Sequence, residues 1–321
     1  VAEVRQALME AALLGVSVGK NVWPHIAKQL AIALQERQEK APDRPLDIIL
    51  AENIHNAAKY SADLLRSHLP ATFPLGEYVG LVETSIGKMV PVQTGDNPLI
   101  VRAEPYNELI VDRKGFLNRV PTIPDIHPVH PIAAYVDRKL FIHNLGHASA
   151  AYLGNAEHPE KRYIAEVLDD PAVFSQVRKT MQQSMEVLLH IYPKVFTRKD
   201  LERHMDDLLF RFGNRALKDT VFRVGRDLRR KLHFDDRLMG IIIEAQRIGM
   251  AWDRIGHVYR TALSFDAVDD NGEPWQPDIE FIDSLADLPT QEKICRASGW
   301  LESSLPKALC HTIAQAFELI L

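Results

Sequence analysis

The stretch LDIILAEN, residues 46–53, decides the fold class of this 321-residue chain. It begins with a short run of β-branched and apolar residues, which is typical of a strand buried on both faces of a sheet. Residues 24–39, PHIAKQLAIALQERQE, precede it with proline at a suitable first helical position and apolar residues at helical spacing. A second helical pattern follows through Leu69. The order helix, buried strand, helix predicts part of a doubly wound α/β sheet.

Polar residues stand directly after the predicted strand. Glu52, Asn53 and Asn56 lie at what should be its carboxyl end. Because doubly wound sheets bind their ligands at the carboxyl ends of the strands, we expect this edge of the sheet to carry functional side chains.

The pattern changes twice further along the chain. Residues 78–112 are rich in valine, isoleucine and tyrosine with turn residues between them, which predicts short strands or hairpins. Residues 120–131, VPTIPDIHPVHP, hold four prolines and predict an extended linker. Beyond it the pattern is helical almost to the end, with one helix expected over 216–231. We therefore predict two domains, an α/β domain over 1–125 and an all-α domain over 126–321.

Composition narrows the class of protein. Apolar residues make up 46% of the chain, the net charge is −5, and basic and acidic residues are interspersed. This balance predicts a globular protein with no nucleic-acid or membrane partner. The two cysteines are too few for a disulfide framework, and no run is apolar enough for a signal peptide or a membrane span. These features together favour a reducing cytoplasm.

The stretch KLFIHNLGH, residues 139–147, places a lysine, an asparagine and two histidines within nine residues of the helical half. On a helical wheel with Lys139 at zero, His143 falls near 40°, His147 near 80° and Asn144 at about 140°. Phe141, Leu145, Ala148 and Tyr152 fall on the opposite side. One side of this helix is therefore expected to pack in the core, and the other presents a lysine, an amide and imidazoles together.

Three interpretations of the polar side stay open on the residues alone. It is a solvated polar face with one or two hydrogen-bonded histidines, or His143 and His147 are two ligands of a zinc ion, or Lys139 acts as a general base. The zinc interpretation has neither an HExxH motif nor an obvious third ligand. A lysine base requires burial or neighbouring positive charge, because its ammonium must lose a proton near neutral pH.

Lys139, Asn144 and His147 fit K-x(4)-N-x(2)-H, the signature of the polyol-specific long-chain dehydrogenases and reductases. Three further stretches extend the likeness: AENIHN (51–56), YVDRKLFIHNLGHASAAYLG (135–154) and LKDTVFRVGRDLRRKLHFDDRL (217–238). The chain thus resembles the mannitol dehydrogenase family over most of its length. The resemblance implies a Rossmann-type nicotinamide-binding domain, a helical substrate domain and a reaction without a metal. By the same resemblance Lys139 is the general base, Asn144 and Asn53 stabilise the oxyanion, and His147 orients the substrate.

The resemblance also assigns basic residues to substrate binding. Arg223 and Lys231 match substrate-contacting positions, and Arg226 or Arg230 would grip a phosphate. Arg223, Arg226 and Arg230 would share a stripe if they lay on one helix. The alternative is an ordinary basic surface paired with nearby acids. Those acids are Asp219, Asp227, Asp235 and Asp236.

The cofactor implied by the family is NAD, yet the chain has no G-x-G-x-x-G. Because the chain starts at Val1 inside a helical pattern, we expect the segment with that motif to lie upstream. The alternative is a truncated protein that cannot hold a dinucleotide. VSVGKNVWPHI (16–26) resembles a later strand and loop of the domain, which places Val18, Gly19 and Asn21 near the nicotinamide.

The resemblance implies NAD-dependent, reversible oxidation of mannitol 1-phosphate to fructose 6-phosphate, with a small-molecule substrate as the partner. One alternative is a related polyol dehydrogenase or hexuronate reductase that acts on a substrate without phosphate. Another is a noncatalytic helical binding module. The sequence leaves the oligomeric state open.

Overall fold

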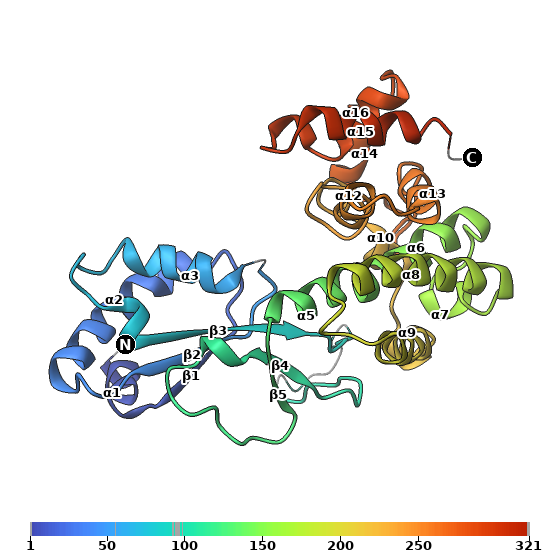
Figure 1. The fold of residues 1–321 in the computed structure, drawn as a ribbon. Coiled ribbons are helices and arrows are strands. Elements are labelled where there is room, and N and C mark those ends of the chain that lie inside the picture. The colour runs from blue at the N-terminus through green and yellow to red at the C-terminus, as the bar shows by residue number, and fades with distance from the viewer. Residues whose placement is uncertain (1, 55, 92, 94–96, 98, 320–321) are drawn as a thin grey trace. The chain divides into compact units, whose positions relative to one another are not determined.

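The structure is a computed structural model that describes residues 2–54, 56–91, 93, 97 and 99–319. The chain divides into two compact units: unit 1 comprises Val1–Lys88 and Pro105–Val136, and unit 2 comprises Met89–Glu104 and Asp137–Leu321. Unit 1 holds a largely parallel sheet with helices, and unit 2 is mostly helical (Figure 1). The predicted fold class is therefore confirmed, whereas the functional division at residues 125 and 126 stays a prediction.

Among the residues that the structure describes, the sheet of unit 1 has five strands in the order β1-β2-β3-β4-β5. They are β1 (Leu13–Val16), β2 (Leu46–Leu50), β3 (Val79–Ile86), β4 (Leu109–Asp112) and β5 (Ile126–Val129). The first three strands are parallel, β4 runs antiparallel to β3, and β5 runs parallel to β4. Every residue of β2 is buried, as the apolar run predicted.

Helices cover this sheet in the expected order. They are α1 (Ala2–Glu10), α2 (Trp23–Lys40), α3 (Ala57–Arg66), the short α4 (Leu75–Tyr78) and the 3₁₀ turn η1 (Arg113–Gly115). Figure 1 shows α2 and α3 side by side above the sheet. Leu30 and Leu34 of α2, Leu65 of α3, and Ile48 and Leu50 of β2 belong to one buried cluster. Each such leucine or isoleucine side chain stabilises the unit by about 1.5–3 kcal/mol.

The Asp47 carboxylate is buried in the sheet and accepts hydrogen bonds there. Asp47 of β2 is 2% exposed and accepts hydrogen bonds from the backbone N–H groups of Leu117 (2.8 Å) and Asn118 (3.2 Å). The side-chain amide of Asn118 donates to it as well, at 3.0 Å. Gly80 stands opposite Asp47 in the register, and a Cβ there would lie 2.1 Å from the Asp47 Oδ1 and 2.6 Å from the Gly115 carbonyl oxygen. The missing side chain at Gly80 thus makes room for this polar contact.

The proline-rich segment 120–131 differs from the prediction. Instead of an unpaired linker it contributes β5, which pairs with β4 at the end of the sheet. Pro128 cannot donate a ladder hydrogen bond, and an edge strand is where a sheet tolerates such a residue. Only the last part of the second predicted hairpin, β4, is a strand, and the described residues 99–108 contain none.

Unit 2 is built from helices of very different lengths. The helical elements after Pro131 are α5 (Ile132–Arg138), η2 (Lys139–Asn144), α6 (Leu145–Glu157), α7 (Ile164–Val167), α8 (Pro171–Ile191), α9 (Arg198–Phe212), η3 (Arg215–Leu217), α10 (Val221–Gly225), α11 (Leu228–Lys231), α12 (Met239–Arg247), α13 (Asp253–Ala262), α14 (Gln276–Asp283), α15 (Thr290–Ala297), η4 (Trp300–Glu302) and α16 (Lys307–Ala316). α6 lies against α8, α10 and α13 at the centre of this unit (Figure 1). A Cβ at Gly146 of α6 would lie 2.6 Å from the Met181 sulfur of α8, so this glycine permits the two helices to approach closely.

Two local features of unit 2 were not predicted. The helix expected over 216–231 is interrupted between α10 and α11, where Asp227 has a φ of 74°. Cys295 of α15 and Cys310 of α16 form a disulfide, with Cα atoms 6.5 Å apart. Their 15-residue separation gave no sign of pairing, because only the packing of α15 on α16 brings them together. Within the described part of the chain, no helix combines the length and the apolar character that a membrane span needs.

The Asp47–Gly80 pair gives a test of the sheet. Gly80→Ala should lower the free energy of unfolding by about 1–3 kcal/mol, because the new methyl group must displace the Asp47 carboxylate or the backbone at Gly115. Urea unfolding followed by circular dichroism measures the change. Gly76→Ala is the matched control: a Cβ at Gly76, in α4, meets nothing within 4 Å. Equal stability of the two variants would contradict the packing described here.

Candidate active site

The segment that carries Lys139 is a π-helix, not an α-helix. η2 (Lys139–Asn144) lies between α5 and α6, and at its end the Leu145 N–H bonds the Leu140 carbonyl, five residues back. The α-helical wheel of the sequence analysis therefore does not hold here. Because π turns join residues five apart, Lys139 and Asn144 lie one turn apart on the same side, whereas an α-helix separates them by about 140°.

Backbone carbonyls of η2 accept hydrogen bonds from side chains of other helices. The buried Ser184 hydroxyl of α8 donates to the Phe141 carbonyl at 2.5 Å. The Arg237 guanidinium donates to the Asn144 carbonyl at 3.5 Å. Single π turns inside α-helices occur often at functional sites. These two side chains tie the turn to the rest of unit 2.

Lys139 meets the requirement for a general base. Burial disfavours its ammonium form and the Arg237 guanidinium repels it, and together they lower the pKa of Lys139 to about 8. At neutral pH the Lys139 side chain is then unprotonated in about a tenth of the molecules. An ordinary surface lysine carries far less.

Of the two histidines in residues 139–147, His143 is buried, the His147 side chain is 16% exposed, and both are uncharged. Burial lowers the pKa of His147 to about 3, with Arg223 as the next cause, and it lowers the pKa of His143 well below its usual value. The His147 ring stacks on Phe212, with centroids 4.7 Å apart and planes 6° apart. The interpretation as a solvated face is therefore wrong. Among the described residues, no three His, Cys, Asp or Glu side chains are grouped to hold a metal ion.

Asp219 joins two of the predicted site residues. Its side chain is 6% exposed, its Oδ2 lies 3.3 Å from the Nε2 of His147, and its Oδ1 forms an ion pair with Arg223. Thr220 caps α10 through its hydroxyl, which accepts the Arg223 N–H at 3.1 Å. The structure thus brings His147 and Arg223 together on one buried carboxylate.

The remaining basic residues do not share a helical stripe, because α10 and α11 are separate helices. Lys231 is buried and donates to the carbonyls of Val224, at 2.6 Å, and Arg226. Burial, with Arg237 as a further cause, lowers the pKa of Lys231 well below its usual value. Arg226 lies over the Trp275 ring, 4.7 Å from its centroid.

Arg230 is held by acids. Its Nε lies 2.5 Å from Asp227 and its Nη1 lies 3.2 Å from Asp236. The alternative of basic residues paired with nearby acids is therefore observed for Arg223 and Arg230.

In unit 1, Glu52 organizes the loop predicted to meet the nicotinamide. Its buried carboxylate accepts the N–H groups of Val18 (2.8 Å) and Gly19 (2.9 Å) and the Trp23 indole N–H (3.2 Å). Gly19 has a φ of 81°, which favours glycine, and a Cβ there would meet nothing within 4 Å. Asn21 lies in the turn before α2.

Asn53 follows Glu52 in unit 1, whereas Lys139, Asn144 and His147 belong to unit 2. The joint action of Asn53 with the other three stays a prediction.

The sequence analysis missed Arg237 and the position of Asp219. Both lie within the stretch 217–238 that carried the family resemblance, so a signal was present. Arg237 is 12% exposed and also pairs with Asp236 at 2.7 Å. The buried pair of Arg211 and Glu104, with contacts of 2.8 and 2.5 Å, was missed too, and it ties residues 89–104 to α9. Nothing in the sequence marked it, because the two residues are 107 positions apart.

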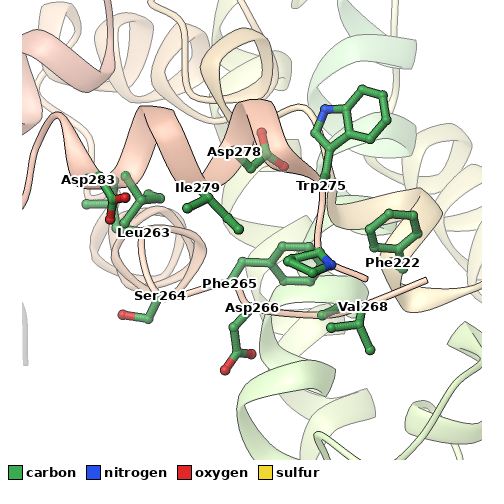
Figure 2. Close-up of a pocket in the computed structure, with 13 residues that line it drawn as sticks. Phe222, Leu263, Ser264, Phe265, Asp266, Val268, Trp275, Asp278, Ile279 and Asp283 are labelled. Carbon is green, nitrogen blue, oxygen red and sulfur yellow. The ribbon is translucent and has the colours of Figure 1, made fainter. Parts of the chain in front are cut away.

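Two of the pockets among the described residues lie in unit 2. The larger, about 420 Å³, is lined mainly by apolar side chains; Figure 2 shows Phe222 and Trp275 toward one end and Leu263 toward the other. None of the predicted site residues lines it. The smaller, about 210 Å³, is lined partly by Phe212 and Asp219, the two residues in contact with His147. The smaller pocket therefore adjoins His147, and the larger one adjoins Arg226, whose guanidinium lies over the rings of Phe222 and Trp275.

Two family models match the chain almost end to end. The mannitol dehydrogenase Rossmann domain matches residues 1–125, and the mannitol dehydrogenase C-terminal domain matches residues 131–305. The predicted family is therefore confirmed.

Individual relatives agree with the family models. The mannitol-1-phosphate 5-dehydrogenase of Bacillus licheniformis is 32% identical over 270 residues, which cover 84% of this chain and 70% of that protein. That of Streptococcus pneumoniae is 26% identical over 291 residues, or 90% of this chain and 76% of that protein.

Solved structures show the same fold. A D-sorbitol dehydrogenase in substrate-free form has a TM-score of 0.75 at 14% identity. The Pseudomonas fluorescens mannitol 2-dehydrogenase, in a ternary complex with NAD and D-mannitol, has a TM-score of 0.67 at 18% identity. Each match covers 99% of this chain and 75% of the other.

The effect of Arg237 on Lys139 can be measured directly. Arg237→Met should raise the pKa of Lys139 from about 8 toward its ordinary value, because the repelling charge is removed while burial remains. The pH dependence of Lys139 acetylation by acetic anhydride, followed by peptide mass spectrometry, gives this pKa. Arg247→Met is the control, because it removes an arginine that pairs with Glu244. An unchanged pKa in Arg237→Met would show that burial alone sets it.

Proposed function

This chain belongs to the mannitol dehydrogenase family, and on that premise we propose that it interconverts mannitol 1-phosphate and fructose 6-phosphate. It is an oxidoreductase, and its cofactor is NAD. The observation that carries the proposal is Lys139, a half-buried lysine with a pKa lowered to about 8, one π turn from Asn144. A base of this kind suits the removal of a proton from an alcohol at neutral pH.

The loop held by Glu52 fits the nicotinamide end of a dinucleotide. It follows β1 at the carboxyl end of parallel strands, where such folds bind their ligands, and Gly19 leaves its backbone open. We propose that Val18, Gly19 and Asn21 contact the cofactor there. When bound, NAD accepts the hydride from the carbinol carbon.

Residues of the protein then accept the hydroxyl proton and stabilise the oxygen of the reacting alcohol. Lys139 Nζ takes the hydroxyl proton as the hydride leaves the carbon, so the alcohol becomes a carbonyl. The amides of Asn144 and Asn53 donate hydrogen bonds to the oxygen while negative charge develops on it. His147 binds a neighbouring hydroxyl, and Arg223 and Lys231 contact the polyol. The reaction scheme requires no metal.

The proposal also includes a phosphate group on the substrate and an arginine that binds it. The named relatives are mannitol-1-phosphate 5-dehydrogenases, and we propose that Arg226 or Arg230 binds the phosphate of the same substrate here. One observation favours the alternative, a polyol or hexuronate without phosphate: Arg230 is already paired with Asp227 and Asp236. We also propose a cytoplasmic location, because charged sugar phosphates do not cross membranes unaided.

The substrate test follows NADH absorbance with fructose 6-phosphate and with fructose. Turnover should require the phosphate ester, and Arg226→Ala should raise the KM for it at least tenfold, a loss of about 1.4 kcal/mol of binding. Arg230→Ala should raise it less, because its guanidinium is shared with two acids.

Arg229→Ala is the control for this test, because the Arg229 guanidinium lies over the Phe281 ring, 5.3 Å from its centroid. Equal turnover of fructose and no effect of either arginine would replace the proposal with the nonphosphorylated alternative. No turnover of either sugar, together with no binding of NADH, would contradict both the proposed substrate and the nonphosphorylated alternative.

The lysine mechanism predicts a pH dependence. For the oxidation of mannitol 1-phosphate, kcat/KM should rise with pH and level off above about 8, because Lys139 must be unprotonated; for the reduction it should fall over the same range. Lys139→Met should lower kcat/KM by about 10²–10⁴-fold. Lys179→Met, at an exposed position of α8, should change neither rate nor profile. Full activity in Lys139→Met would refute the lysine base.

A further inference from the structure

The guanidinium of Arg226 lies over two aromatic rings. Its Cζ is 4.7 Å from the centroid of the Trp275 ring and 5.4 Å from that of the Phe222 ring. Both distances are within the range of a favourable cation–π interaction. The two rings line the larger pocket toward the same end (Figure 2). Two aromatic side chains from different segments of unit 2 therefore hold this cation.

Arg226 differs in its partners from the neighbouring arginines of the same segment. Arg223 forms an ion pair with Asp219, and Arg230 forms one with Asp227. Among the residues that the structure describes, no acid pairs with the Arg226 guanidinium. An aromatic ring attracts a guanidinium but does not occupy its N–H groups as a carboxylate does. The N–H groups of Arg226 are therefore available to an incoming anion.

Hydrogen bonds fix the position of Trp275 relative to Arg226. Trp275 directly precedes α14, and its carbonyl accepts the Asp278 N–H at 2.8 Å. The Asp278 carboxylate is 7% exposed and accepts the backbone N–H groups of the two residues after Arg226, at 2.8 and 2.7 Å. On the other side, the Phe222 carbonyl accepts the Arg226 N–H at 3.0 Å. Both rings and the guanidinium thus belong to one hydrogen-bonded framework.

The charge of Arg226 acts on the neighbouring site residue Arg223. Burial lowers the pKa of Arg223, and the positive charge of Arg226 is the next cause. Cations this close repel each other, and an anion bound beside them relieves the repulsion. The available N–H groups of Arg226 and the adjoining positive charge together suit a phosphate monoester.

We propose that Trp275 is a positioning residue that makes the site specific for phosphorylated substrates, because it holds the Arg226 guanidinium with its N–H groups ready to bind the phosphate. This inference rests on the proposed function and selects Arg226 from the two candidate arginines. Arg230 would first have to leave Asp227 and Asp236. Since Trp275 restricts a long side chain before the substrate arrives, its effect lies in substrate binding and not in the chemical step.

The KM for fructose 6-phosphate measures this positioning. Trp275→Leu stays apolar but removes the aromatic ring, so it should raise this KM about five- to tenfold and leave kcat unchanged. Trp275→Phe keeps a ring and should restore most of the wild-type KM. Trp275 is 39% exposed, so neither substitution empties the core, and circular dichroism checks the fold. Equal KM values in the two variants, or a fall in kcat, would overturn the proposal.

Phe281→Leu is the matched control, because Phe281 of α14 also has a guanidinium over its ring, that of Arg229 at 5.3 Å. It should leave the KM unchanged. Adding Trp275→Leu to Arg226→Ala should raise the KM no further than Arg226→Ala alone, because Trp275 acts through Arg226. Additive effects of the two substitutions would contradict the proposal. Trp275→Met takes the place of Trp275→Leu if the leucine variant does not fold.

Binding of inorganic phosphate tests the positioning role without turnover. The ³¹P signal of inorganic phosphate should broaden with the wild-type protein, less with Trp275→Leu and least with Arg226→Ala. This order without turnover of fructose 6-phosphate would keep the positioning role and refute the proposed function. Equal broadening in all three proteins, or none with the wild type, would overturn the positioning role, and turnover of fructose 6-phosphate would then leave the proposed function intact.

Discussion

The π-helical conformation of Lys139–Asn144, which ends with a hydrogen bond from the Leu145 N–H to the Leu140 carbonyl, determines the geometry of the site. It places the lysine and the amide on the same side of a continuous helical segment. A π turn is unstable by itself, and here Ser184 and Arg237 bind its carbonyls from neighbouring helices. The packing of unit 2 therefore maintains a local conformation that the chain would otherwise avoid.

Positive charge is concentrated around this turn, and it lowers the pKa of each base nearby. Arg237 is among the causes that lower the pKa values of Lys139, His147 and Lys231. Burial acts in the same direction for all three, because it disfavours the charged form of a base. Acids offset the charge locally: Asp219 pairs with Arg223 and Asp236 with Arg237. The site thus lowers the pKa values of its bases and keeps its guanidinium groups charged within one small region.

The sequence predicted the central strand of the sheet and the helical unit well, because both follow from apolar spacing, whereas it missed β5. β2 and α2 were expected nearly at their observed bounds. The π turn was not predictable from spacing, since an α-helical wheel assumes 3.6 residues per turn throughout. The break at Asp227 was also missed, because Asp278, 51 residues later, accepts the Asp227 N–H at 2.8 Å and so fixes the turn. Contacts over such separations are invisible to local patterns.

Three acidic residues inside the fold accept hydrogen bonds from the backbone of a connecting segment. Asp47 binds the backbone after η1, Glu52 binds the loop after β1, and Asp278 binds the turn between α10 and α11. Each of these three carboxylates accepts at least two backbone N–H groups from a loop or from the first residue of the helix that follows it. Buried N–H groups without partners are costly, so each carboxylate stabilises one defined loop conformation. Loops that carry function thereby become as well positioned as the helices and strands beside them.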